Sequence, residues 1–329
     1  MNTSLEPKNP VKEEVFQTIP QLFDPETRYP AIDRLLRLKK ENPHIDVEGY
    51  VWNSAGIPAL IISEITATQS LLFDPILVPE IAIRTISFYN LLALIAKRTY
   101  SLKEFMRCQI VTFLFPIMNC TRNEPLISAI RLGAWNVLAA LFEHDDVNIT
   151  MALTRQFWHL ILIELTRSTM YFSEPLVALH ILRKIVSTPE GVAFVTSRDN
   201  IDALSTALRA TISHVGVRCQ RYLLISKEES INRHVSIHTP PHRIDEVIIA
   251  GGSDILNIKK PLDECSVLSV KHVVKILTVV IANLKEQRKD TFTFLAIVNF
   301  FMNDAMFSTV RPLLGQDMIK DMNTLMEMQ

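Results

Sequence analysis

The stretch IRTISFYNLLALIAK, residues 83–97, decides the fold, because it recurs later in the chain as IRLGAWNVLAALFEH, residues 130–144. Arg84 falls on Arg131 and Phe88 falls on Trp135, and the offset between the two copies is 47 residues throughout. The apolar residues of both copies follow the 3.6-residue spacing of a helix that buries a broad face. They pair as Leu91 with Leu138, Leu94 with Leu141 and Ile95 with Phe142.

A third copy, EPLVALHILRKIVSTPEGVAFVT at residues 174–196, follows the second at a step of 44. Its Leu179, Leu182 and Ile185 take the apolar positions of the first two copies. A helical period of about 40–47 residues is typical of armadillo and HEAT repeats, in which neighbouring repeats share one continuous core. We therefore predict an all-α fold, an armadillo-type α-solenoid.

The composition agrees with a large helical core. The chain has 329 residues, 48% of them hydrophobic and 21% charged, and contains only 8 glycines. So few glycines argue against a glycine-rich-loop α/β enzyme or a turn-dense β-barrel. The net charge of −1 indicates neither a generally basic nor a generally acidic protein, so any binding charge must be local.

The polar breaks between apolar runs predict helix starts. Asp24 with Pro25 predicts the start of a helix that carries Ile32, Leu35 and Leu36, while Ser101 with Glu104 reads as a capping box. Thr188 before Pro189, and Asp145 or Asp146, predict two later starts. Apolar spacing predicts further helices at residues 11–18, 155–172, 201–227, 263–286 and 288–306.

We divide the chain into a disordered leader (1–10), a repeat domain (11–285) and a helical, Met-rich extension (286–329). The N-terminus has no apolar core of a signal peptide, and we find no run of about 18 apolar residues that would span a membrane. The four cysteines form no C-x-x-C pair and are expected to be reduced, buried thiols. The expected location is the cytoplasm, the nucleus or both.

No motif in the chain points to catalysis. The nucleotide-binding glycine motifs, the H-E-x-x-H zinc motif and the nucleophile elbow are all missing from the sequence. His234, His238 and His242 have metal-ligand spacing, but Pro240 and Pro241 interrupt any helix that would align them. We therefore predict no catalytic residue, no metal site and no cofactor.

Local basic residues are the better candidates for function. In an armadillo stack the third helices of successive repeats line one concave face, and all three aligned copies read as third helices. A basic groove along this face would hold an acidic peptide or a nucleic-acid backbone, whereas cations that only keep an exposed face soluble are the plainer reading. The candidate groove residues are Arg84, Arg131, Arg183, Lys184, Arg218 and Arg221.

Several strings also resemble the Rcd-one/Caf-forty family of cell-differentiation proteins, the armadillo subunit of the Ccr–Not mRNA deadenylase complex. They are LFDPETRYPAIDRLLRLKKE, the pattern Trp52-Asn53-Ser54-Ala55-Gly56 before IPALIISEI, FLFPIM, RLGAWNVLAALF and ILRKIVSTPEGVAFV, in the family's order. The resemblance covers about residues 20–235, with a weaker echo to about residue 285.

This resemblance implies about six armadillo-type repeats, no catalysis, docking on the Not scaffold subunit and recruitment of adaptor proteins through short peptide motifs. It places Arg84, Arg131 and Lys184 on basic family positions, whereas Arg183 falls where the family usually has Gln. Weak binding of RNA or DNA and a homodimer stay open, and no membrane partner is expected. The alternative is a general armadillo-type peptide carrier unrelated to mRNA decay.

Overall fold

The computed structural model describes residues 10–167, 173–215, 262–287, 291–303 and 316–327. All regular secondary structure in these ranges is helical, which confirms the predicted all-α class. The described residues up to His144 form one compact unit, unit 1, and those from Asp145 onward form a second, unit 2.

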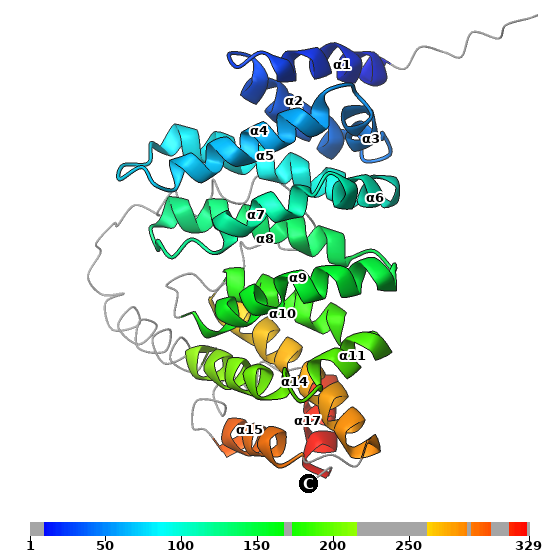
Figure 1. The fold of residues 1–329 in the computed structure, drawn as a ribbon, viewed down its shortest axis with the longest axis vertical. Coiled ribbons are helices and arrows are strands. Elements are labelled where there is room, and N and C mark those ends of the chain that lie inside the picture. Colours follow the sequence, from blue (N-terminus) through cyan, green and yellow to red (C-terminus); the bar gives the residue numbers. More distant parts are fainter. Residues whose placement is uncertain (1–9, 168–172, 216–261, 288–290, 304–315, 328–329) are drawn as a thin grey trace, which may run out of the picture. The chain divides into compact units, whose positions relative to one another are not determined.

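Unit 1 is a succession of packed helices, drawn from blue to green in Figure 1. Its elements are α1 (Pro10–Thr18), the 3-10 helix η1 (Ile19–Phe23), α2 (Arg28–Glu41), α3 (Val47–Trp52), α4 (Ile57–Leu71), α5 (Pro79–Ala96), α6 (Thr99–Arg107), α7 (Ile110–Met118) and α8 (Pro125–Phe142).

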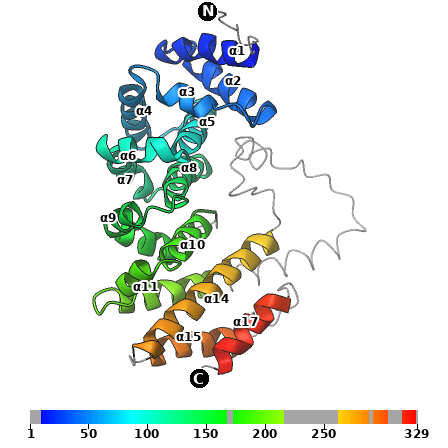
Figure 2. The ribbon, with the colours of Figure 1, turned by 90° about the vertical axis from the view of Figure 1, so that its right-hand side faces the viewer.

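Helices α5 and α8, which carry the first two sequence copies, pack directly against each other, and both views show them as neighbours (Figures 1 and 2). Each has 18 residues and begins with a proline at its first turn. Gly133 permits their close approach, since a Cβ there would lie 2.8 Å from the Cβ of Tyr89. Trp135 and its aligned residue Phe88 are both buried, so the two copies place the same aromatic position in the core.

The same two helices are long and apolar enough to cross a membrane by length and composition alone. In the structure 56% of the apolar window of α5 and 83% of that of α8 are buried inside the protein. Their apolar faces are buried against other helices of unit 1, as expected of core helices.

Unit 2 is built around α10 (Ser173–Ile185), whose Leu179, Leu182 and Ile185 are all fully buried. Helices α9 (Val147–Thr166) and α14 (Leu262–Glu286) pack against α10, and α14 also contacts the last two labelled helices (Figure 2). Residues 201–215 are helical as well. The remaining elements are α11 (Pro189–Val195), α15 (Phe292–Asn303) and α17 (Gln316–Glu327).

Two of the predicted helix caps are confirmed. Thr188 accepts a hydrogen bond from the backbone N–H of Gly191 at 3.1 Å and begins α11. Asp146 accepts from the N–H groups of Asn148 and Ile149 and begins α9. A side chain that accepts from the first free N–H groups of a helix stabilises that end, which explains why these breaks could be recognised.

The other two predicted caps are wrong. Asp24 follows η1, and its carboxylate accepts from the Glu26 N–H and the Thr27 hydroxyl, so it closes a turn, and α2 starts only at Arg28. Asp and Thr make such local turns as readily as helix caps. Helix α6 begins at Thr99 after Arg98, so Ser101 lies inside the helix.

The helix at residues 263–286 is confirmed by α14, and α15 lies within the predicted range 288–306. Helix α9 begins eight residues before the predicted 155 and ends at Thr166, since Asp146 caps it. Pro10 already belongs to α1. Cys108 and Cys120 are half-buried free thiols. The leader before Pro10, residues 216–227 and the three spaced histidines lie outside the described residues.

The close approach of α5 and α8 leads to a stability prediction. Gly133→Val places a branched side chain against Tyr89 and should lower the free energy of unfolding by about 2 kcal/mol or more through overpacking. Ala67→Val, at an exposed position of α4, is the matched control, with an expected loss of about 0.5 kcal/mol. The measurement is urea unfolding followed by circular dichroism, and equal losses in the two variants would contradict the packing account.

Candidate functional site

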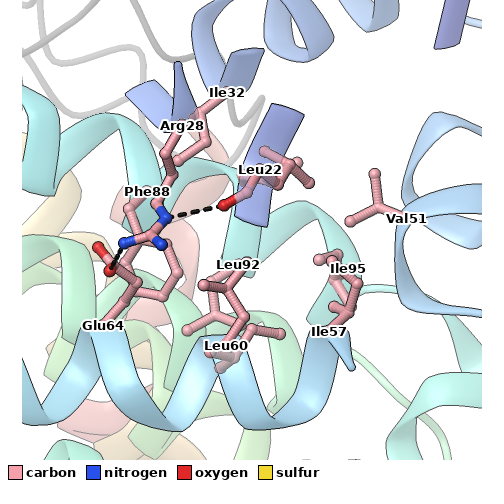
Figure 3. Close-up of a pocket in the computed structure, with 12 residues that line it drawn as sticks. Leu22, Arg28, Ile32, Val51, Ile57, Leu60, Glu64, Phe88, Leu92 and Ile95 are labelled. Atoms are coloured by element: carbon pink, nitrogen blue, oxygen red, sulfur yellow. Dashed lines mark hydrogen bonds and ion pairs between the residues drawn. The ribbon is translucent and has the colours of Figure 1, made fainter. Parts of the chain in front are cut away.

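The strings that resemble the family meet in unit 1 around one ion pair. Arg28, at the start of α2, donates to a carboxylate oxygen of Glu64 on α4 at 2.5 Å and to the Leu22 carbonyl at 2.8 Å (Figure 3). The Tyr29 hydroxyl donates to the other Glu64 oxygen at 2.9 Å. The side chains of Arg28 and Glu64 are only 15% and 9% exposed. The pair therefore joins α2 to α4 in a setting where loss of one partner is costly.

The W-x-S-x-G string ends at the same place. Gly56 caps α4 with a left-handed φ of 87°, and a Cβ there would lie 3.1 Å from the Phe23 ring. Glycine is thus required both by the backbone conformation and by the close ring. Trp52 stacks on Phe105 with ring centroids 5.0 Å apart. The residues of the family-like strings described so far therefore make structural contacts within unit 1.

The pocket drawn in Figure 3 lies beside this ion pair and is lined mostly by aliphatic side chains. The space open to water centres is about 20 Å³, room for about one water molecule. A binding site for a small organic ligand needs a volume of several hundred Å³. The pocket is therefore a packing gap capped by Arg28 and Glu64.

Arg84 is an exposed residue of α5 and lies above the ring of Tyr29, with its guanidinium carbon 5.6 Å from the ring centroid. This arrangement is a cation–π contact at the surface. Arg84 therefore matches the prediction of a solvent-facing cation, and whether it faces a groove stays a proposal.

Arg131 differs from the prediction, because its side chain is fully buried in α8. Its guanidinium donates to the backbone carbonyls of Cys120 at 2.9 Å and Arg122 at 2.8 Å, in the connection between α7 and α8. Arg131 thus satisfies carbonyl groups that would otherwise be buried without a donor. It cannot contact a peptide while it makes these bonds, so its place in the repeat alignment reflects a structural role.

The connection between α4 and α5 presents two large apolar side chains to solvent. Phe73 and Ile76 are 87% and 77% exposed. Arg122 holds this connection in place by donating to the backbone carbonyls of Leu72 at 2.9 Å and Asp74 at 2.5 Å. Apolar side chains displayed on a fixed loop are typical of protein contact surfaces.

Several cations of unit 2 lie on α10 and α14. Arg183 and Lys184 occupy the last turn of α10 and are both half-buried. The His180 ring meets the ring of His272 on α14, with centroids 5.8 Å apart. Burial, and then the nearby positive charges of Arg183, His180 and Lys275, lower the pKa of His272 to about 3. The helices therefore bring Arg183 close to cations that sequence reasoning did not connect with it.

The proposed site residues thus separate into four cases. Arg84 is exposed in unit 1, and Arg131 is buried there. Arg183 and Lys184 lie in unit 2, while Arg218 and Arg221 fall outside the described residues. In the described parts of the chain no group of three His, Cys, Asp or Glu side chains could hold a metal ion.

The comparisons with known proteins bear on the same residues. A model of the cell differentiation family, Rcd1-like, matches residues 18–240. The chain belongs to this family. Protein CAF40 of Saccharomyces cerevisiae is 23% identical over 180 residues, which are 54% of this chain and 48% of that protein. Cell differentiation protein rcd1 of Schizosaccharomyces pombe is 27% identical over 135 residues, 41% and 47% of the two chains. The match spans about half the length of each of these relatives.

The Rcd1-like match begins just before the Arg28–Glu64 pair and ends beyond α11, so it takes in residues of both units. Sequence reasoning missed Tyr29 and Glu64 as partners, although both stand in the quoted family strings. It also missed Lys275 and Asp321, because nothing in the local pattern connects α14 or α17 with α10.

The two aligned arginines should respond differently to the same substitution. Arg131→Glu buries a carboxylate among carbonyl groups and should lower the free energy of unfolding by about 3 kcal/mol or more. Arg84→Glu removes only an exposed cation–π contact, for an expected loss of about 1 kcal/mol or less. Thermal melts followed by circular dichroism compare them, and equal melting temperatures would mean that Arg131 is not a structural residue.

Tyr29 should make stability sensitive to alkaline pH. Burial, and then the charge and hydrogen bond of Glu64, raise the pKa of Tyr29 from the usual 10.0 to about 12. At a pH below the pKa of Tyr29 in the unfolded chain, its contribution to the free energy of unfolding is fully present. It is lost as the pH rises through the folded-state value, because the folded protein keeps the proton longer.

Tyr29→Phe removes this contribution, so the free energy of unfolding of the variant should fall less steeply as the pH rises above 10. The expected difference is about 1 kcal/mol, since the half-exposed ring is partly screened by solvent. Urea unfolding at several alkaline pH values measures it. An unchanged pH profile would contradict the Tyr29–Glu64 hydrogen bond.

Proposed function

We propose that this protein is a non-catalytic scaffold subunit of a Ccr–Not type deadenylase complex. The observation that carries the proposal is the Rcd1-like match across residues 18–240. The proposal extends to the fold, for which we infer an armadillo-type solenoid of about six repeats. The packing of α5 on α8, the helices of the first two sequence copies, supports that inference.

A scaffold of this kind acts by proximity. It would dock on the Not scaffold subunit and recruit adaptor proteins through short peptide motifs, which raises the local concentration of the deadenylase on a transcript. The exposed Phe73 and Ile76 on their fixed loop support a protein-contact role. We infer action in the cytoplasm and the nucleus, where deadenylation and gene regulation would require it.

Affinity purification of the tagged full-length chain tests the docking. A Not-type scaffold subunit and deadenylase subunits should be enriched among the co-purified proteins identified by mass spectrometry. Arg131→Glu is the control, because its lower stability should reduce the enrichment. A folded wild-type chain that captures no Not scaffold from cells that express one would overturn the proposal.

A tethering assay separates this function from that of a general peptide carrier. The chain fused to an RNA-binding module and bound to a reporter transcript should shorten the poly(A) tail and the lifetime of that transcript. A carrier unrelated to mRNA decay would leave both unchanged, and that result would favour the alternative.

A further inference from the structure

Unit 2 contains a cleft lined by residues of α14 and α17, by Arg183 of α10 and by the two residues that follow α10. Its volume is about 240 Å³, enough for a side chain of a bound segment. The residues that line it are Arg183, Val186, Ser187, Lys275, Thr278, Val279 and Asp321.

Two cations of this cleft have no ion-pair partner among the residues that the structure describes. Arg183 is half-buried and Lys275 is exposed, and among the described residues no carboxylate lies within salt-bridge distance of either. Asp321 on α17 lines the same cleft without reaching them. In unit 1, by contrast, Arg28, Arg122 and Arg131 all donate to carboxylates or carbonyls of the fold. The cleft therefore offers positive charge that no carboxylate in the described parts of the chain neutralises through an ion pair.

The hydroxyl groups of the cleft narrow the choice of ligand. Ser187 already donates its proton to the Lys184 carbonyl at 2.6 Å, and Thr278 donates to the Val274 carbonyl at 2.9 Å. The donors left for a ligand are thus the guanidinium of Arg183 and the ammonium of Lys275. Arg183 also stands in the last turn of α10, the negative end of the helix dipole, which disfavours a doubly charged phosphate more strongly than a singly charged carboxylate.

A single carboxylate fits this donor set. It carries one charge and two acceptor oxygens, and the planar fork of an arginine can engage both. Val279 is 37% exposed at the cleft and offers an apolar surface to an aliphatic side chain beside the carboxylate. The pKa of His272 is lowered first by burial, and the positive charges of Arg183 and Lys275 are among the contributions that add to this shift.

We propose that this cleft binds an acidic side chain of a peptide segment from a partner protein, with Arg183 and Lys275 holding the carboxylate and Val279 contacting a neighbouring aliphatic residue. The inference rests on the proposed adaptor-recruiting function and names the chemistry of the recruited peptide. Asp321 does not reach the two cations, but its negative charge lies in the same cleft and opposes the binding of an acidic ligand.

Fluorescence anisotropy with the full-length chain tests the cleft. The probe is a labelled twelve-residue peptide of Glu, Leu and Val, and the comparison peptide has Gln in place of every Glu. Arg183→Gln combined with Lys275→Gln should weaken binding of the acidic peptide by about tenfold. Asp321→Asn should tighten binding by about threefold, since it removes the opposing negative charge.

The matched control is Arg155→Gln combined with Arg209→Gln, which changes the charge of unit 2 equally at two exposed positions outside the cleft. Circular dichroism verifies that every variant is folded. Equal affinity of the cleft and control variants, or equal binding of the two peptides, would overturn the proposal. So would tight binding of an oligouridylate that depends on Arg183 while the acidic peptide does not bind.

The same variants separate this proposal from the docking function. Cleft variants that lose the peptide but still co-purify with the Not scaffold support both. If the wild-type chain binds the peptide through Arg183 but captures no scaffold, the scaffold proposal fails and the cleft stands as a peptide site.

Discussion

The packing of α5 against α8 is the contact on which unit 1 depends. Each helix carries one copy of the same apolar pattern, and neither can bury that face alone. Gly133 lets the two backbones approach across Tyr89, and Trp135 on α8 is fully buried. The other helices of unit 1 add their apolar faces to this pair, α2 on α5 and α7 on α8.

Arginine side chains fix the connections between these helices. Arg28 binds the Leu22 carbonyl, Arg122 binds those of Leu72 and Asp74, and Arg131 binds those of Cys120 and Arg122 itself. Loop carbonyls near a core have no helical partner, and a charged donor satisfies them at a favourable hydrogen-bond energy. These three arginines of unit 1 thus help to hold the fold together. The pair of Arg183 and Lys275 in unit 2, which has no ion-pair partner among the described residues, differs from them for this reason.

Much of the fold follows from local pattern. The offset of 47 residues identified the helices of the first two copies, and the side chains of Thr188 and Asp146 identified helix starts. Prediction from the local pattern was wrong where the same residue type occurs in two different structural roles. Asp24 closes a turn as readily as it caps a helix, and Arg131 shares its repeat position with Arg84 although only one of them is buried. Periodicity predicts which face of a helix a residue lies on. It does not predict whether a loop carbonyl that needs a donor lies next to that residue.

The candidate site was less predictable, because it depends on contacts between helices distant in the sequence. Arg183 could be singled out as a cation in an apolar run, but its neighbours Lys275 and Asp321 come from α14 and α17. The ion pair of Arg28 with Glu64 likewise joins two quoted strings that no spacing rule connects. The family strings could be recognised from the sequence, whereas the contacts between them are visible only in the structure.

Native-state hydrogen exchange followed by mass spectrometry tests the central claim most directly. If the α5–α8 contact holds unit 1 together, the central amides of both helices should exchange only through the same cooperative unfolding, with one common free energy close to that of unit 1 as a whole. Exchange of α8 at a markedly lower free energy than α5, while the rest of unit 1 stays protected, would contradict it.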